Sequence, residues 1–247
     1  MDQLLVALDV DTAAEARALA DSLRGAVGGF KIGSRLFTSH GPSVVEQLVA
    51  RGDRVFLDLK FHDIPNTVAG AVAAATRLGV WMVNVHAAGG AAMMRAAIDA
   101  AREEAAKRSA QPPLVIAVTV LTSLSDSNLA ESGITGSMNQ AVERMARLVQ
   151  SSGLDGVVAS PREIALIRRS CGTSLTIVTP GIRGVGDERG DQSRTMSAAE
   201  ALNEGASYLV VGRPIIAAPD PRKAAERLAA GSTHGATVSE SPQQPAR

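Results

Sequence analysis

The chain has 247 residues, of which 45% are hydrophobic, which provides enough apolar material for one large domain or two small ones. Its 25 Lys and Arg residues balance 25 Asp and Glu residues, and aromatic residues make up only 2%. Nucleic-acid-binding proteins usually carry a positive surface or aromatic residues that stack on bases, so we exclude that class.

The sequence also argues against export and membrane insertion. The N-terminal residues MDQLLVALDVD carry an acid where a secretory signal needs positive charge. The longest apolar region, residues 79–94, is interrupted by Asn84 and His86 and falls short of the ~20 residues that span a bilayer. Cys171 is the single cysteine, and the four histidines share no metal-ligand spacing with it. We therefore expect a cytoplasmic protein without an internal disulfide or a structural zinc ion.

Runs rich in Val, Ile and Leu alternate with Ala-, Glu- and Arg-rich segments of helical period along the chain. Strands are predicted to start at Leu4, Gly29, Arg54, Met82, Leu114, Gly156, Leu175 and Tyr208. Helices are predicted at residues 12–23, 42–50, 66–78, 91–108, 139–150, 162–170, 197–205 and 221–230. Eight strand-helix units in about 250 residues are typical of an α/β protein with a (β/α)₈ TIM barrel.

An open, doubly wound sheet is the rival architecture. It normally carries a G-x-G-x-x-G turn after the first strand, whereas this chain has LDVDTAAEA, with Asp11 or Thr12 as the helix cap. The barrel is expected to be a single domain over residues 1–231. Residues 232–247 are polar, contain Pro and lack periodicity, which predicts a disordered tail.

The segment RVFLDLKFHDIPNT places charges directly after a buried strand. Val55, Leu57 and Leu59 share one parity and are expected to face the helices, which turns Asp58 and Lys60 toward the barrel axis. A solvated helix face does not explain this spacing, because helical neighbours are three or four residues apart. Chemistry in this fold gathers at the C-terminal ends of the strands, where these two side chains are expected to lie.

The first two strands add two more charges of inward parity, Asp9 and Lys31. Asp9, Lys31, Asp58 and Lys60 are therefore expected to form an alternating acid-base row with no net charge, which costs less to bury than a lone charge. A purely structural ion-pair network at the end of the barrel is the alternative interpretation.

The loops after the seventh and eighth strands are the usual phosphate site of this fold. Here they contain GIRGVGDERGDQSR and VGRPI. Glycine lets the backbone approach a phosphate and arginine offers paired donors, so we expect a mobile lid over the substrate and a phosphate contact from Arg213 at the end of the last strand. An ordinary flexible surface loop is the alternative for the lid.

Together, these motifs resemble a known family. The segments LDV, FKIG, DLKFHDIPNT, VTVLTS, PGIR, GDQSR and VGRPI are similar, in the same order, to those of orotidine 5′-phosphate decarboxylases of the short bacterial type. The resemblance covers the chain except for its tail. It implies decarboxylation of orotidine 5′-monophosphate to uridine 5′-monophosphate and CO₂, without cofactor or metal, as the last step of de novo pyrimidine biosynthesis.

The resemblance also implies residue roles. Lys60 resembles the family's proton donor, with Asp58 and Asp63 beside it and Lys31 completing the charged row. Asp63 and Thr67 resemble the pair that reaches the neighbouring subunit's site, which implies a homodimer. The other implied substrate contacts are Asp9 and Lys31 at the ribose, Thr122 and Ser123 near the pyrimidine, and Arg183, Gln192, Gly212 and Arg213 at the phosphate and its lid. For Thr122 and Ser123, local capping of the following turn is the alternative.

Physical chemistry supports the same reading of Lys60. Loss of CO₂ from an sp² ring carbon leaves a carbanion-like centre, which a nearby cation stabilises more than it stabilises the substrate.

Two other functions compete with this one. A magnesium-dependent decarboxylase or aldolase of the same superfamily would carry an acid where this chain has Lys31, whose charge would repel the metal ion. A catalytically inactive phosphate-binding module would have no need of the charged row.

Overall fold

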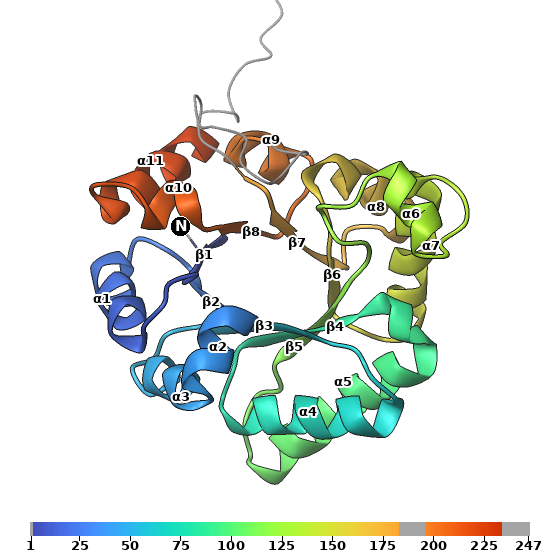
Figure 1. The fold of residues 1–247 in the computed structure, drawn as a ribbon, viewed down its shortest axis with the longest axis horizontal. Helices are drawn as coiled ribbons and strands as arrows, with labels where there is room; N and C mark the ends of the chain where they lie inside the picture. The colour runs from blue at the N-terminus through green and yellow to red at the C-terminus, as the bar shows by residue number, and fades with distance from the viewer. Residues whose placement is uncertain (1, 183–195, 234–247) are drawn as a thin grey trace, which may run out of the picture.

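The computed structural model describes residues 2–182 and 196–233. Within these residues, eight parallel strands form a closed barrel in chain order, and the first strand pairs with the last to complete it (Figure 1). The predicted TIM barrel is therefore confirmed. Arg183, Gln192 and residues 234–247 of the expected tail lie outside the described residues. Residues 232–233, which were expected to begin that tail, instead form the end of the last helix.

All eight predicted strands are present. They are β1 (Leu4–Ala7), β2 (Gly29–Gly33), β3 (Val55–Phe61), β4 (Met82–His86), β5 (Leu114–Val118), β6 (Gly156–Val158), β7 (Thr176–Pro180) and β8 (Tyr208–Val211). Among the strands that end earlier than expected, β1 ends at Ala7 and β8 at Val211, so Asp9 and Arg213 lie just beyond these strands. At β8 the reason is Pro214, which cannot donate to a strand ladder but suits the first turn of a helix.

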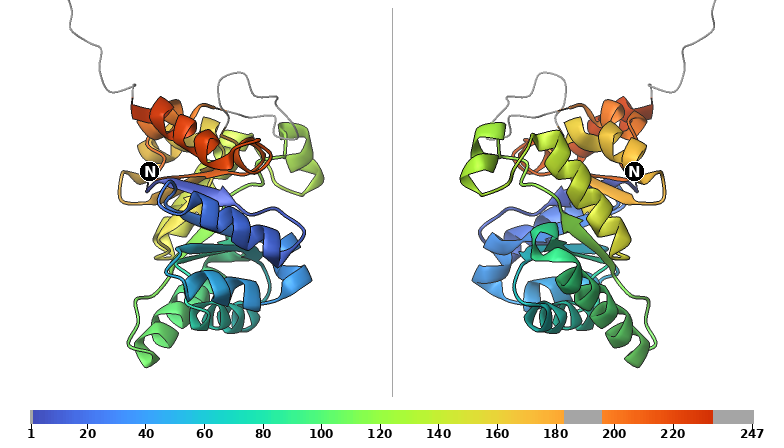
Figure 2. Two further views of the ribbon diagram at one scale, coloured as in Figure 1. Left: turned by 90° about the vertical axis from the view of Figure 1, so that its left-hand side faces the viewer. Right: turned by 90° about the vertical axis from the view of Figure 1, so that its right-hand side faces the viewer.

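The predicted helices are also present, and they surround the strands in all three views (Figures 1 and 2). They are α1 (Ala13–Leu23), α3 (Ser43–Val49), α4 (Pro65–Arg77), α5 (Gly90–Lys107), α7 (Met138–Ser151), α8 (Ile164–Cys171), α9 (Ala198–Asn203) and α11 (Pro221–Thr233). Five short elements were not predicted: α2 (Ser34–His40), α6 (Asp126–Glu131), α10 (Arg213–Ile216), η1 (Ala87–Gly89) and η2 (Pro161–Glu163). None of the helices in the described part of the chain has the length and apolar character needed to cross a bilayer.

Thr12, rather than Asp11, caps α1. Its hydroxyl accepts a hydrogen bond from the Glu15 amide at 3.1 Å, and the Glu15 carboxylate accepts one from the Thr12 amide at 3.2 Å. This reciprocal pair satisfies two backbone donors that the first turn of a helix leaves unpaired.

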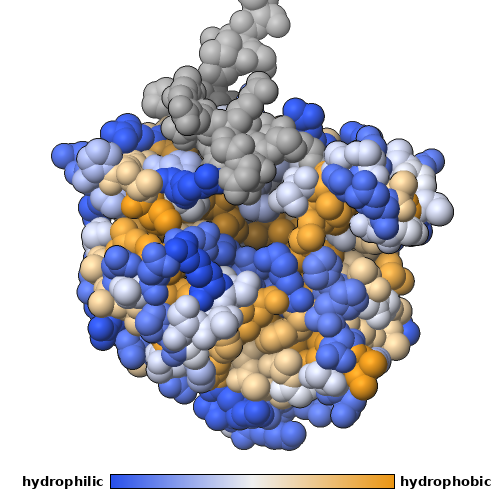
Figure 3. Space-filling view, viewed as in Figure 1, coloured by the Kyte–Doolittle hydropathy of each residue, from blue (hydrophilic) through white to orange (hydrophobic). Residues whose placement is uncertain are grey.

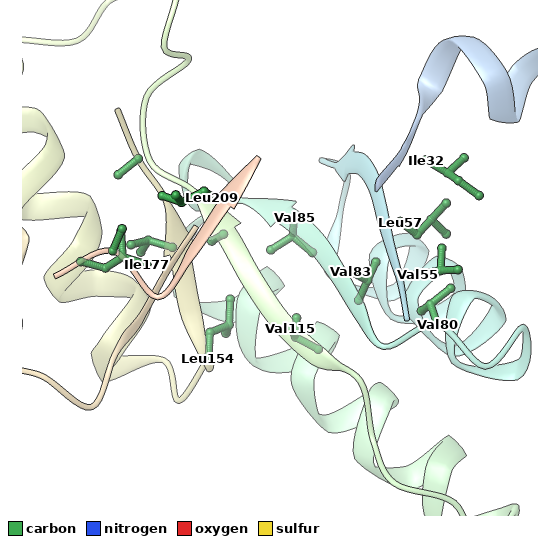
Figure 4. Packing of buried hydrophobic residues seen from close by; sticks show 14 of the residues in the cluster. Ile32, Val55, Leu57, Val80, Val83, Val85, Val115, Leu154, Ile177 and Leu209 are labelled. Atoms are coloured by element: carbon green, nitrogen blue, oxygen red, sulfur yellow. The ribbon is translucent and has the colours of Figure 1, made fainter. Parts of the chain in front are cut away.

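Apolar side chains separate into two clusters according to strand parity. The larger cluster lies between strands and helices, and Figure 4 shows Ile32, Val55 and Leu57 together on that side. A smaller cluster, which includes Phe56 and Met82, fills the barrel interior. The alternation predicted for the first three strands is confirmed. It directs the polar residues of the opposite parity, such as Lys31 and Asp58, toward the barrel axis.

The N-terminal end of the barrel interior is closed by aromatic residues. Trp81 immediately precedes β4, and Tyr208 is the first residue of β8. Their rings meet edge to face with centroids 5.0 Å apart. Both rings pack against the apolar cluster that fills the barrel interior.

Candidate active site

A cavity of about 550 Å³ opens at the C-terminal ends of the strands. Its polar lining residues are Asp9, Lys31, Arg35, Asp58, Lys60, Thr122 and Arg213. Apolar side chains such as Phe56 and Val178 form its floor within the barrel. Figure 3 looks down the barrel and shows hydrophilic and hydrophobic surface side by side around the centre of this face.

The row of four charges predicted from strand parity is present. Lys31 Nζ lies 3.2 Å from Asp9 Oδ1 and 3.3 Å from Asp58 Oδ2, and Lys60 Nζ lies 2.6 Å from Asp58 Oδ1. The two inner side chains, Lys31 and Asp58, are 10% and 13% exposed, whereas Asp9 and Lys60 at the two ends are 50% and 37% exposed. The ends of the row are therefore accessible to a ligand in the cavity, while its centre is held by ion pairs.

Asp58 is ionised at neutral pH despite its position inside the protein. Burial by itself would raise the pKa of its carboxyl group, but the charges of Lys31 and then Lys60 lower it. Hydrogen bonds from Lys60 and Asn84 lower it further, and the net result is a pKa below the ordinary carboxyl value. A negative charge is thus fixed beside the ammonium group of Lys60.

Lys60 lies in an irregular part of β3. Its φ of 54° is in the left-handed region, which costs a residue other than glycine roughly 1–2 kcal/mol. Between the paired residues Leu57 and Phe61, β3 advances by four residues while β4 advances by two, from Val83 to Val85. The ladder is therefore interrupted where the chain presents Lys60 to the cavity.

Asn84 is a site residue that sequence analysis missed. It is fully buried on β4, accepts a hydrogen bond from the Lys60 amide at 2.8 Å and donates one to Asp58 Oδ1 at 2.7 Å. A usable signal was present, because Asn84 stands between Val83 and Val85, whose helix-facing parity turns it toward the barrel interior.

Gly33, at the end of β2, leaves room for the lysine in the row. A Cβ atom at this position would lie 3.0 Å from Lys31 Nζ and 3.5 Å from Asp9 Oδ1. The first distance is too short for comfortable packing, so any larger residue here would displace the ammonium group.

Arg35 is a second cavity residue that sequence analysis missed. It lies in the first turn of α2, which was not predicted, and its guanidinium pairs with the carboxylate of Asp11. The helix starts immediately after β2, so it brings a residue of a supposed loop to the cavity edge.

The phosphate end of the predicted site is described in part. Gly181 after β7 and Gly212 after β8 line the cavity together with Arg213, the first residue of α10. Arg213 was expected at the end of a strand, but it is instead the first residue of the short helix that follows β8. Arg183 and Gln192 lie outside the described residues and remain predictions.

The predicted pyrimidine contacts separate. Thr122 lines the cavity, whereas its neighbour Ser123 is exposed and is not part of the lining. Asp63 and Thr67 are also exposed and do not line the cavity of their own chain. The Asp63 carboxylate accepts a hydrogen bond from the Ile64 amide at 2.6 Å, which fixes its orientation outside the cavity.

Two histidines, His62 and His86, stand beside the charged row. The rings of His62 and His86 have centroids 5.4 Å apart and are tilted relative to each other. Burial lowers the pKa of His86, and the nearby His62 and Lys60 lower it further. His86 is therefore a neutral side chain at neutral pH.

Within residues 2–182 and 196–233, no group of three or more His, Cys, Asp or Glu side chains is arranged to hold a metal ion. The two acids of the charged row, Asp9 and Asp58, are instead joined by Lys31. An ammonium group between two carboxylates satisfies their charge, and it would repel a divalent cation at the same place.

Residues 2–228 match the family described as Orotidine 5′-phosphate decarboxylase / HUMPS family. The orotidine 5′-phosphate decarboxylase of Moorella thermoacetica is 57% identical over 93% of this chain and 91% of its own length. That of Syntrophotalea carbinolica is 53% identical over 92% and 93%, respectively. A crystal structure of orotidine 5′-phosphate decarboxylase from Lactobacillus acidophilus superposes with a TM-score of 0.83 at 35% identity, covering 93% of this chain and 98% of that one. This chain belongs to the orotidine 5′-phosphate decarboxylase / HUMPS family.

Proposed function

We propose that this protein decarboxylates orotidine 5′-monophosphate to uridine 5′-monophosphate and CO₂, the last step in the synthesis of that pyrimidine nucleotide. The observation that carries the proposal is the charged row, which ends in the accessible ammonium group of Lys60 inside a cavity that also contains Arg213. The relatives named above support the same activity.

Lys60 is the residue that we assign to the chemical step. Departure of CO₂ leaves an electron pair on the ring carbon, in the plane of the ring and without a neighbouring group to delocalise it. A fixed cation at that carbon stabilises the transition state more than the substrate, and the Lys60 ammonium group then donates a proton to complete the product.

Asp58 has two roles in this proposal. Its negative charge, kept by a pKa below the ordinary carboxyl value, lies 2.6 Å from Lys60 Nζ and holds the ammonium group in place. It also stands near the departing carboxylate, where two unit charges ~4 Å apart repel by about 4 kcal/mol at an effective dielectric constant of ~20. Loss of CO₂ relieves that repulsion.

The remaining assigned residues bind the substrate away from the reacting carbon. Asp9 and Lys31 bind the ribose hydroxyls, Thr122 and Ser123 lie at the pyrimidine, and Gly212 and Arg213 bind the phosphate together with Arg183 and Gln192. Binding energy from this remote phosphate orients the ring for reaction. No metal ion or organic cofactor takes part in this scheme.

We also propose a cytoplasmic homodimer in which Asp63 and Thr67 reach the neighbouring site. Both residues are exposed and outside their own cavity, and Ile64 between them is an apolar side chain that is 66% exposed. A second copy of the chain would cover Ile64. In such a dimer, Asp63 of one subunit would lie beside Lys60 of the other.

An assay of the purified protein with orotidine 5′-monophosphate tests the function directly. Turnover is followed by the change in ring absorbance and by released CO₂, with and without excess EDTA. The proposal predicts turnover that EDTA does not reduce. Absence of turnover would refute the proposed reaction, and loss of turnover in EDTA would support the magnesium-dependent alternative instead.

A further inference from the structure

We propose that Asn84 is a positioning residue that holds the backbone of Lys60 and the carboxylate of Asp58 in a single arrangement. The kinetic part of this inference rests on the proposed function, whereas its structural part does not. Asn84 is not part of the cavity lining, so it acts through the two charged residues.

The irregularity of β3 creates the need for such a residue. Between Leu57 and Phe61, β3 contains two more residues than the facing stretch of β4, so the Lys60 amide has left the regular ladder. A buried amide without an acceptor is strongly unfavourable. The Asn84 side-chain oxygen accepts this hydrogen bond at 2.8 Å and thereby replaces the missing strand partner.

The same side chain serves the acid of the row. Asn84 Nδ2 donates to Asp58 Oδ1 at 2.7 Å, and Lys60 Nζ contacts that oxygen at 2.6 Å. One amide therefore fixes the carboxylate and the backbone of the lysine that pairs with it. Both polar ends of Asn84 are used, and the side chain is fully buried.

These two bonds explain why an amide is needed. A carboxylate at position 84 could accept from the Lys60 amide but would repel Asp58. A hydroxyl is too short to bridge both groups, and an aliphatic side chain would leave the Lys60 amide unpaired. Only Asn has one donor and one acceptor at this length and separation.

The charge on Asp58 is also shaped by charged and titratable groups on its own strand and on neighbouring elements. Lys31 from β2, Lys60 from β3 and His86 from β4 face it, and Asp9 beyond β1 is joined to it through Lys31. Asn84 is the uncharged member of this surrounding set. Its replacement therefore changes the geometry of the row without removing any of its charges.

Asn84→Leu removes both hydrogen bonds at similar volume. We expect kcat to fall by about 100-fold, the size of effect that a misplacement of ~1 Å can produce, with KM changed by less than about threefold because the phosphate and ribose contacts remain. Thr119→Val is the matched control. Thr119 is buried beside β5, donates a hydrogen bond to the Val158 carbonyl at 3.2 Å and does not line the cavity.

Asn84→Asp provides a readout that a merely structural role would not change. The carboxyl group that it introduces lies beside Asp58, so its pKa is raised, and it can donate to Asp58 only when protonated. We expect kcat relative to wild type to increase as the pH falls from about 8 to about 6. A constant ratio over that range, or an Asn84→Leu variant that is folded and as active as Thr119→Val, would overturn the inference.

Crystal structures of the wild type and the Asn84→Leu variant test the positioning role without reference to turnover. We expect Lys60 φ to leave the left-handed region and the Lys60–Asp58 contact to change in the variant. An unchanged row would refute the inference even if the wild-type protein is an active decarboxylase. A displaced row in a protein that does not decarboxylate would refute the proposed function and support the role of Asn84.

Discussion

Lys60 Nζ and Asp58 Oδ1 are 2.6 Å apart although the two residues are only two positions apart on one strand. On a regular strand such residues lie on the same face and their Cα atoms are separated by ~6.6 Å. The long lysine side chain and the left-handed φ of Lys60 together bring the charges into contact at the cavity. The irregular backbone is therefore part of the candidate site.

The lowered pKa of Asp58 predicts how stability depends on pH. A carboxyl group whose pKa is lower in the folded protein contributes stability above its unfolded pKa of about 3.9, and loses this contribution as the pH falls through its folded value. We expect the free energy of unfolding of wild type, relative to Asp58→Asn, to decline below about pH 4. Urea unfolding at a series of pH values measures this difference. A difference that is constant or that increases on acidification would contradict the assignment.

Gly33→Ala should disturb the charged row without removing a charge. The added Cβ atom would lie 3.0 Å from Lys31 Nζ, so the ammonium group must move away from Asp9 or Asp58. We expect kcat/KM for orotidine 5′-monophosphate to fall by about tenfold, a loss of about 1.4 kcal/mol in transition-state binding. Steady-state kinetics on the folded variant provide the measurement, and unchanged kcat/KM would show that the position of Lys31 is not critical.

The proposed shared site predicts complementation between two inactive variants. When Asp63→Ala and Lys60→Ala chains are mixed, dissociated and allowed to reassociate, a mixed dimer contains one site with both native residues. Random association should restore about a quarter of the wild-type activity per site.

Mixing Lys60→Ala with Asp58→Asn is the matched control for that experiment. Both residues belong to the row of one chain, so no mixed dimer contains an intact site and no activity should return. If the Asp63→Ala mixture also stays inactive, Asp63 does not act across subunits.

The membership of the charged row could be predicted from sequence because strand assignment and parity direct its residues toward the barrel axis. Lys31, Asp58 and Lys60 each stand between apolar neighbours of the opposite parity, and their strands are adjacent in chain order. In a closed barrel, these two facts are sufficient to bring the side chains together.

Asn84 shows the limit of that reasoning. Parity alone turns it inward, but its two hydrogen bonds depend on the shifted register between β3 and β4, which is a property of the folded pair. Arg35 was missed because a helix begins directly after β2, and Arg213 was placed on a strand because the effect of Pro214 on the end of β8 was overlooked. Local backbone changes at strand ends therefore decide which residues reach the cavity.

Lys60→Ala tests the central claim most directly, with Lys223→Ala as the control because Lys223 is an exposed lysine paired with Asp220 on the outer surface. We expect kcat for orotidine 5′-monophosphate to fall by at least about 1,000-fold in Lys60→Ala, while binding of uridine 5′-monophosphate is retained and Lys223→Ala remains fully active. Near-normal turnover by a folded Lys60→Ala variant would contradict the account.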